Sequence, residues 1–575
     1  MNSDQGLLAT NRSPQPVWSG LDPVHGATDS LSATKDDISG SYTTYRPPLP
    51  FHPPIWAQSR QELCESFDWF RSYQGGVYHA NNAVKGYLLS AFPASRDCFE
   101  HAGKLIISHG GGKAECLHTH KGHVAADDQL AQDKSVRALL TTYYECRPLV
   151  LVIDDKYTLF PYDLGTKDIT YAILGFYTIV AAWAEYQPAH NERGRVVRYK
   201  FAFRWCESQG QPWWGTAHPE GIACPEPAAI SAVDQNYLCS ACGASSPHIY
   251  TQGWACLNTE CSAFWKTKNG SGLPDELAYR DEFLRLLASL KVSPILDDLF
   301  SPTVPYDKEV NANTGYTFSR GWHCRGCGRL SCRVKMEHWE CSSCQAVHSI
   351  TGRVRCAQEF WQEIPSINFR DFLIWEQSEV QRLPQRLFKS SLDTGHVQSF
   401  ILPNGWGVIH HIQHSTEAGR RSADDVFEEY QHQANAGELP FRRWPLRSVI
   451  RGPMLTNYFS QNCTPSSHAN VGSKFKKSYI YQYVGGTANT LPFSKAPSAV
   501  LSARKLIQTR IEAALAQSVD FNEVLSAAYM ERQRMAGDVL VMEGLQIQEH
   551  YEHTVVPTNY RIAATARWID PERHL

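Results

Sequence analysis

Cys324-Arg325-Gly326-Cys327 and Cys341-Ser342-Ser343-Cys344 form the stretch that decides the fold of the middle of the chain. Each Cys-x-x-Cys turn brings two thiolates within reach of one ion, and a second pair a short hairpin away completes a tetrahedral zinc site. Because all four positions are filled by cysteine, such a site is structural and not catalytic.

The same arrangement occurs earlier in the chain, with a longer second spacing. Its four cysteines are Cys239, Cys242, Cys256 and Cys261. The spacing therefore predicts two zinc-ribbon-like modules, each built on four cysteines. Redox activity of the Cys-x-x-Cys pairs is the minor alternative.

Composition is that of an ordinary globular protein. The chain has 575 residues, of which 42% are hydrophobic and 20% charged, and a net charge of −3. This length predicts several domains, and the charge predicts no global attraction to nucleic acid, so any such binding needs a local patch. No apolar run reaches the ~20 residues of a membrane helix, and no signal peptide is visible. The clustered cysteines favour a reducing intracellular compartment, nuclear or cytoplasmic.

The N-terminal part divides into a polar tail and a β-rich region. Residues 1–54 are rich in Ser, Thr, Asp, Gly and Pro, which predicts a disordered tail. Residues 55–235 contain short β-branched and aromatic runs such as Val196–Phe203, in which Arg198 and Lys200 face away from the aromatic side chains. A small barrel or sandwich within an α+β domain is expected.

Two short segments of this region resemble the modified-base reader barrels of the SRA type. They are Gly175–Val180 and Gln211–Trp214. Core packing of the same aromatic residues is the favoured interpretation.

The end of the chain carries a second pattern. In Gly537–Leu575, Val539 and Val541 alternate with other apolar residues, and Arg561 and Arg567 share one face of a later strand. Between these predicted strands lies His553. An ordinary β-hairpin and a metal-holding barrel both fit these residues.

Six segments together resemble the AlkB-like 2-oxoglutarate/Fe(II) dioxygenases of the fungal type. They are Gly452–Gln461, Tyr483–Thr487, Asn522–Glu531, Met542–Gly544, Tyr551–Pro557 and Arg561–Arg567. The resemblance covers the last third of the chain. It implies a double-stranded β-helix (jelly roll), with iron and 2-oxoglutarate as cofactors and oxidative demethylation of alkylated nucleic-acid bases or methylated amines as the reaction. It implies that His553 binds iron, and that Tyr529, Arg561 and Arg567 hold 2-oxoglutarate.

The chain departs from that family at one place. Relatives carry a His-x-Asp segment and further strands where Met535 here runs directly into Ala536. Because Fe(II) needs two His and one carboxylate on one face, the iron site is incomplete and the expected jelly roll is truncated. An exon missing at the Met535–Ala536 junction is the favoured explanation, and a pseudo-enzyme is the alternative.

The expected organisation has seven parts. They are the tail (1–54), the β-rich domain (55–235), the first four-cysteine module (236–268), a helix and linker (269–318), the second four-cysteine module (319–360), a lead-in (361–450) and a truncated dioxygenase domain (451–575). Amphipathic helices are predicted over Glu276–Lys291 and Ser498–Leu515, and a hairpin over Phe400–Ile412.

Two functions remain open. One is the AlkB-like dioxygenase, inactive as written. The other is a non-catalytic zinc-containing protein that binds nucleic acid or protein. DNA or RNA could contact the zinc modules and the run Arg442–Arg451, in which Trp444 is interleaved with arginines. A solvated basic face is the equal alternative for that run.

Overall fold

The computed structural model describes most of the chain from residue 46 onward. The described ranges are 46–91, 94–111, 127–189, 191–215, 236–274, 276–300, 314–350, 353–361, 386–393, 395–401, 407–414, 416–446, 454–465, 490–530, 539–543 and 560–568. Helices are few and the strands form several sheets, which confirms the mixed α+β class with a β-rich N-terminal region.

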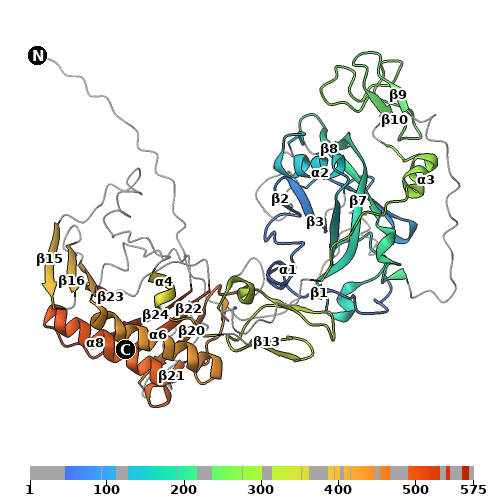
Figure 1. Ribbon diagram of the computed structural model, residues 1–575. Coiled ribbons are helices and arrows are strands. Elements are labelled where there is room, and N and C mark those ends of the chain that lie inside the picture. Colours follow the sequence, from blue (N-terminus) through green and yellow to red (C-terminus); the bar gives the residue numbers. More distant parts are fainter. Residues whose placement is uncertain are drawn as a thin grey trace, which may run out of the picture. The chain divides into compact units, whose positions relative to one another are not determined.

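An eight-stranded sheet organises the N-terminal region (Figure 1). Its strands are β1 (Trp56–Ala57), β2 (Val77–Ala80), β3 (Ala83–Leu89), β4 (Cys98–Glu100), β5 (Leu105–His109), β6 (Pro148–Asp154), β7 (Tyr171–Pro188) and β8 (Arg195–Trp205). The order is β2-β3-β6-β7-β8-β5-β4, and β1 pairs with β7. Only β3 and β6 pair in parallel; the other described pairs of this sheet are antiparallel.

Two helices pack on this sheet region. Helix α1 (Arg60–Ser66) is capped at Ser59 by a capping box. The Ser59 side chain accepts a hydrogen bond from Glu62 N–H, and the Glu62 side chain accepts one from Ser59 N–H. Helix α2 (Lys134–Tyr144) packs on β2, β3 and β7. It buries Val136, Ala138, Leu139 and Thr142, and the Thr142 hydroxyl accepts from Val84 N–H and donates to the Ala138 carbonyl.

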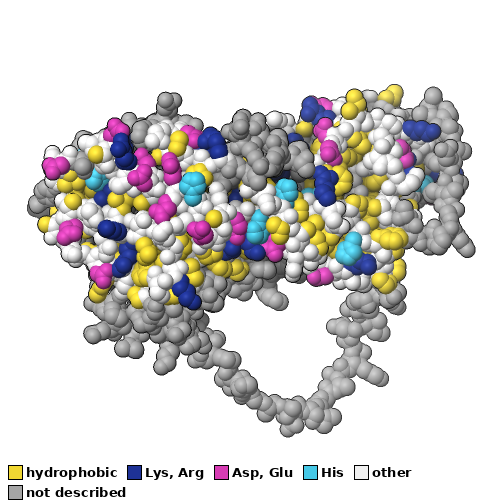
Figure 2. All heavy atoms as spheres, turned by 60° about the horizontal axis from the view of Figure 1, so that its bottom comes forward, with side chains coloured by type: hydrophobic (Ala, Val, Ile, Leu, Met, Phe, Trp, Pro, Cys, Tyr) yellow, Lys and Arg dark blue, Asp and Glu magenta, His cyan; other side chains and the backbone are white. Residues whose placement is uncertain are grey.

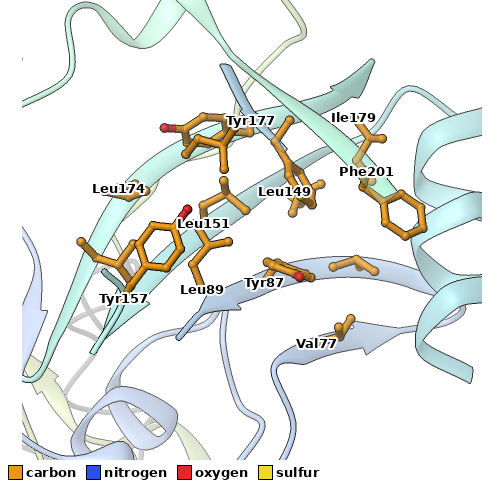
Figure 3. Close-up of a cluster of buried hydrophobic side chains, with 14 of the residues drawn as sticks. Val77, Tyr87, Leu89, Leu149, Leu151, Tyr157, Leu174, Tyr177, Ile179 and Phe201 are labelled. Carbon is orange, nitrogen blue, oxygen red and sulfur yellow. The ribbon is translucent and has the colours of Figure 1, made fainter. Parts of the chain in front are cut away.

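The core lies between α2 and the strands, as Figure 3 shows for a cluster of buried side chains. Its labelled members are Val77, Tyr87, Leu89, Leu149, Leu151, Tyr157, Leu174, Tyr177, Ile179 and Phe201. Strand β8 is buried along both faces. Arg198 and Lys200 therefore do not reach solvent, whereas the polar face of an ordinary half-buried strand does. Lys200 instead forms an ion pair with buried Asp97.

The two four-cysteine modules contain only short strands. Strands β9 (Asn236–Leu238) and β10 (Ser245–Pro247) belong to the first module. Strands β11 (Trp322–His323), β12 (Leu330–Ser331), β13 (His338–Glu340) and β14 (Val347–Ser349) belong to the second. Helix α3 (Asp281–Ser289) lies between the modules, inside the predicted range Glu276–Lys291, and helix α4 (Gln358–Trp361) follows the second module.

The C-terminal part contains two four-stranded sheets. One has the order β15 (Arg386–Leu392), β16 (Gly395–Ile401), β17 (Val408–His414) and β23 (Val539–Glu543). The other has the order β21 (Thr490–Pro492), β20 (Phe459–Thr464), β22 (Glu523–Tyr529) and β24 (Arg561–Arg567). A short pair, β18 (Pro445–Leu446) and β19 (Met454–Leu455), precedes β20.

Helices α6 (Glu417–Ala436) and α8 (Ser498–Leu515) lie side by side against the second of these sheets (Figure 1). The bounds of α8 match the helix predicted from the sequence, and the predicted hairpin is the β16–β17 pair. The predicted jelly roll is not confirmed; the described C-terminal strands form two four-stranded sheets and one short two-stranded pair.

Gly175 provides a test of the sheet geometry. It sits at an irregularity between β6 and β7 with φ +145, and a Cβ there would lie 2.6 Å from Gln209 Oε1 and 3.0 Å from the Trp205 ring. Gly175→Ala is expected to lower the free energy of unfolding by about 3 kcal/mol, because backbone strain adds to overpacking.

Gly210→Ala is the matched control for that substitution. Gly210 also has positive φ, but nothing lies within 4 Å of an added Cβ. Its cost, from backbone strain without overpacking, is expected to be about 1–2 kcal/mol. Equal losses for the two variants in urea unfolding would contradict the packing explanation.

Candidate metal centres and nucleic-acid interface

The first four-cysteine module gathers its four predicted cysteines at one point. Sγ of Cys239 lies 3.9 Å from Sγ of Cys261, and Sγ of Cys242 lies 3.8 Å from Sγ of Cys256. All four sulfurs lie within 4.8 Å of one another. Tetrahedral Zn–S bonds of about 2.3 Å separate sulfurs by about 3.8 Å, so the donor set fits a zinc ion.

The second module also gathers the sulfurs of its four predicted cysteines at one point. Sγ of Cys324 lies 3.5 Å from Sγ of Cys344, and Sγ of Cys327 lies 3.4 Å from Sγ of Cys341. Gly328 follows the first pair with φ +78, and a Cβ there would lie 2.5 Å from the Pro54 carbonyl oxygen. This position therefore requires glycine both for its backbone conformation and for the close approach of the N-terminal segment.

One thiol in each cluster is already poised to ionise near neutral pH. Backbone N–H groups of Cys242 and Ala241 lower the pKa of Cys239 to about 7. Burial opposes ionisation of Cys341, but N–H groups of Cys344 and Ser343 lower its pKa to about 7. Burial raises the pKa of Cys256 and of Cys327 to about 12. Near neutral pH these two thiols are therefore protonated until a bound metal ion displaces the proton.

The first module is anchored to the large sheet by a buried carboxylate. The Tyr250 hydroxyl donates to Glu185 Oε2 at 2.5 Å, and Trp183 Nε1 donates to the Tyr250 hydroxyl at 3.1 Å. Arg96 pairs with Glu185 Oε1 at 2.9 Å. Glu185 is fully buried in β7, so these donors replace the water that it loses.

The second module is anchored to the N-terminal segment and α1. Trp56 Nε1 donates to the Cys327 carbonyl at 2.7 Å, and Arg329 pairs with Glu62 at 2.8 Å. Arg443, from the segment before β18, reaches Glu65 of α1 with both terminal nitrogens, at 2.6 and 2.8 Å. Both side chains of this pair are largely buried.

These contacts change the interpretation of the basic run Arg442–Arg451. Arg442 forms two bonds to Glu337, at 2.6 and 2.7 Å, and Arg443 is committed to Glu65. Trp444 Nε1 donates to the Ser460 carbonyl. The described arginines of the run thus form internal ion pairs, and Arg447 and Arg451 lie outside the described residues.

A cleft between the β7–β8 hairpin and the first four-cysteine module presents a different set of cations. Its volume is about 510 Å³, and its lining includes Tyr186, Arg195, Phe264, Trp265 and Lys266. The Arg195 guanidinium lies 4.3 Å from the centre of the Tyr186 ring. The Tyr186 ring centre lies 5.1 Å from that of Phe264 and 5.8 Å from that of Trp265.

The cleft cations differ from the buried ones in their surroundings. Arg195 and Lys266 are exposed, and among the described residues no carboxylate forms an ion pair with either. Arg193, at the hairpin tip, pairs with Asp128 at 3.0 Å, and the Arg193 side chain is 59% exposed. Sequence patterning did not single out these residues, because they come from three separated segments.

The residues predicted to hold iron and 2-oxoglutarate are placed only in part. Tyr529 and Arg561 pair across β22 and β24, with the guanidinium 5.9 Å from the ring centre. Arg567 Nη1 lies 3.4 Å from Glu523. His553 and the Met535–Ala536 junction lie outside the described residues. In the described ranges, only the two cysteine sets gather at metal-binding distance.

No protein-family model matches the chain, and no curated protein matches it. Solved structures do. The modification-dependent TagI restriction endonuclease is 19% identical with a TM-score of 0.22, covering 29% of this chain and 55% of the endonuclease. A SUVH5 SRA complex with methylated CHH DNA is 17% identical with a TM-score of 0.20, covering 29% of this chain and 97% of that one. KRYPTONITE in complex with mCHH DNA, an H3 peptide and SAH is 18% identical with a TM-score of 0.22, covering 32% of this chain and 37% of the KRYPTONITE chain.

These findings correct the family prediction. The similar structures named above are an endonuclease, an SRA domain and KRYPTONITE, and not AlkB-like dioxygenases. The prediction of a 2-oxoglutarate/Fe(II) dioxygenase is therefore wrong. Its physical weakness is that it rested on short strand motifs, which are compatible with many two-sheet folds.

The Glu65–Arg443 pair predicts a large effect on stability. Glu65→Ala leaves Arg443 buried without its carboxylate, and we expect the free energy of unfolding to fall by about 3 kcal/mol. Glu417→Ala, in an exposed i,i+4 pair with Arg421, is the control and is expected to cost less than about 0.5 kcal/mol. Similar losses for both variants would contradict the assignment.

The same pair sets a pH dependence. Burial alone would raise the pKa of Glu65, but hydrogen bonding and charge from Arg443 hold it below its usual value. The unfolded chain therefore binds the proton more readily, so the stabilisation is complete above about pH 5 and declines as the pH falls through the folded pKa. The stability difference between wild type and Glu65→Gln should shrink on acidification.

Proposed function

We propose that this chain is a non-catalytic, zinc-containing nucleic-acid-binding protein. The observation that carries the proposal is the cleft at the first four-cysteine module, where exposed Arg195 and Lys266 flank aromatic side chains without a paired carboxylate in the described residues. Cations that form no internal ion pair are available for phosphate oxygens, and adjacent aromatic rings are available for bases.

Local charge matters here because the chain as a whole is slightly acidic. Its net charge is −3, and Figure 2 shows Lys and Arg side chains interspersed with Asp and Glu on one face. A uniform basic surface therefore does not support the proposal. The support comes from the pairing pattern, since Arg96, Arg329 and Arg443 are neutralised internally while the cleft cations are not.

The same proposal assigns a structural Zn(II) ion to each four-cysteine cluster. The ion would be held by Cys239, Cys242, Cys256 and Cys261 in the first module, and by Cys324, Cys327, Cys341 and Cys344 in the second. Each module has only short strands, and the first has a small core of its own around Cys239, Trp254, Cys256 and Cys261, so metal binding would contribute much of its folding free energy. Four thiolates leave no coordination position open for a substrate. The described helices include none that is both long and apolar enough to cross a membrane.

Metal content tests the zinc assignment. We expect two zinc ions per wild-type chain, and one for Cys341→Ser, by elemental analysis of the purified protein. Cys146→Ser is the control, because Cys146 is exposed and outside both clusters, and it should retain two. Chelation should lower the melting temperature of the wild type. Unchanged zinc content in Cys341→Ser would contradict the assignment.

Binding assays test the nucleic-acid proposal. Fluorescence anisotropy should compare the wild type with Arg195→Ala/Lys266→Ala, using single strands, an unmodified duplex and a methylated duplex. The methylated duplex is included because the similar SUVH5 SRA structure contains methylated DNA. We expect the double variant to bind roughly tenfold more weakly and to show a smaller salt dependence, because two phosphate contacts are lost.

Lys505→Ala is the control, since Lys505 is exposed on α8, outside the cleft lining. It should bind like the wild type. If the double variant binds every nucleic acid as tightly as the wild type does, the proposed interface is wrong.

A further inference from the structure

We infer that the cleft binds an unpaired, single-stranded segment of nucleic acid that crosses the Arg195–Tyr186 pair. This inference rests on the proposed function and names the form of its ligand. The observation behind it is that a second hollow, of about 450 Å³, adjoins the cleft and shares Tyr186 and Arg195 with it.

The two hollows extend from this shared pair in different directions along the chain. The cleft continues to Phe264, Trp265 and Lys266 of the first four-cysteine module. The second hollow continues to Arg193 and Gly194 at the hairpin tip. The Arg195 guanidinium lies over the Tyr186 ring, 4.3 Å from its centre, and these two side chains line both hollows. A ligand that fills both hollows contacts the shared pair and both sets of flanking residues, which suits an extended chain.

The arrangement of charge along this path suits a sugar–phosphate backbone. Lys266 lines the cleft, Arg193 lines the second hollow, and Arg195 lines both. Asp128 neutralises Arg193, which leaves two cations with no ion pair among the described residues. Two phosphate contacts predict a shallow salt dependence for a single strand, with log K falling by about 1.4 per decade of salt.

The aromatic side chains distinguish an unpaired strand from a duplex. Tyr186 and Phe264 are half-buried and line the cleft beside the cations. In a duplex the base faces are stacked on one another, so only phosphates and groove edges can reach a protein surface. An unpaired base offers its face to an aromatic ring, and this stacking depends little on base identity.

The anchoring of the first module keeps the path open. Tyr186 directly follows Glu185, whose buried carboxylate accepts from Tyr250 of the module region and pairs with Arg96. The two walls of the cleft are thus held together by the same buried group. A preformed groove binds without the entropic cost of ordering its walls.

The test uses the full chain with fluorescein-labelled single-stranded DNA, single-stranded RNA and a duplex of the same length and base composition. We expect the wild type to bind one or both single strands at least roughly tenfold more tightly than the duplex. Tyr186→Leu should reduce single-strand affinity roughly tenfold and change the weak duplex binding much less, because the stacking ring is lost while both cations remain, although Arg195 loses the ring beneath it. Phe264→Leu, from the other wall, should act in the same direction.

Tyr144→Leu is the matched control. Tyr144 is 75% exposed at the end of α2, outside both hollows, and its variant should bind like the wild type. Melting curves of all variants show whether a loss of affinity reflects unfolding, and Phe264→Leu remains decisive if Tyr186→Leu fails to fold.

The outcomes separate the two proposals. Duplex binding as tight as single-strand binding, weakened by Arg195→Ala/Lys266→Ala but not by the aromatic substitutions, would overturn this inference and leave the proposed function intact. Absence of binding to all of the probes would overturn both. Preference for DNA over RNA, or the reverse, with loss in Tyr186→Leu supports the inference and identifies the strand.

Discussion

The structure depends on the burial of one carboxylate, that of Glu185. An ionised carboxylate without water is costly, and here four side chains replace that water: Arg96, Trp183, Gln187 and Tyr250. Tyr250 belongs to the segment that carries the first four-cysteine module, whereas Glu185 belongs to β7. Removing one member of such a set leaves the others unsatisfied in a medium of low dielectric constant. A shift of the module along the sheet would break both hydrogen bonds of the Tyr250 hydroxyl, the one it donates to Glu185 and the one it accepts from Trp183, and would leave the buried carboxylate short of a donor.

The second module is held by the same physical means, with different partners. Its backbone accepts from Trp56, and its Arg329 pairs with Glu62 of α1. Arg443, from the segment before β18, pairs with Glu65 of α1 and also donates to the Arg333 carbonyl of the module. In both cases a module with little core of its own is joined to its neighbours by buried, charge-assisted hydrogen bonds. Such bonds have strict geometry, so they specify one docking arrangement. Apolar contact alone tolerates sliding. The proposed zinc ions then stabilise each module internally while these bonds position it.

Features could be predicted from the sequence where the residues that determine them lie close together in the chain. The four-cysteine clusters and helix α8 were predictable because their determinants are close together in the chain: Cys-x-x-Cys spacing and helical periodicity. The partners of Lys200 and Arg443 were not, since Asp97 and Glu65 are distant in sequence. The cleft was missed for the same reason, because Tyr186, Arg195 and Lys266 meet only after folding. The dioxygenase prediction went wrong where it extended short motifs to a whole domain.

Exposure by itself does not identify a functional cation, and this chain shows why pairing is the better criterion. The run Arg442–Arg451 is the more conspicuous basic feature of the sequence, yet both of its described arginines are neutralised by glutamates. Arg195 and Lys266 are inconspicuous, but they stand beside aromatic rings in a concave site with no ion-pair partner among the described residues. A phosphate that displaces a carboxylate must overcome an existing pair, whereas a phosphate that meets an unpaired guanidinium displaces only water. In a chain of slightly negative net charge, this difference in local pairing is why we propose the cleft, and not the run Arg442–Arg451, as the place where a polyanion binds.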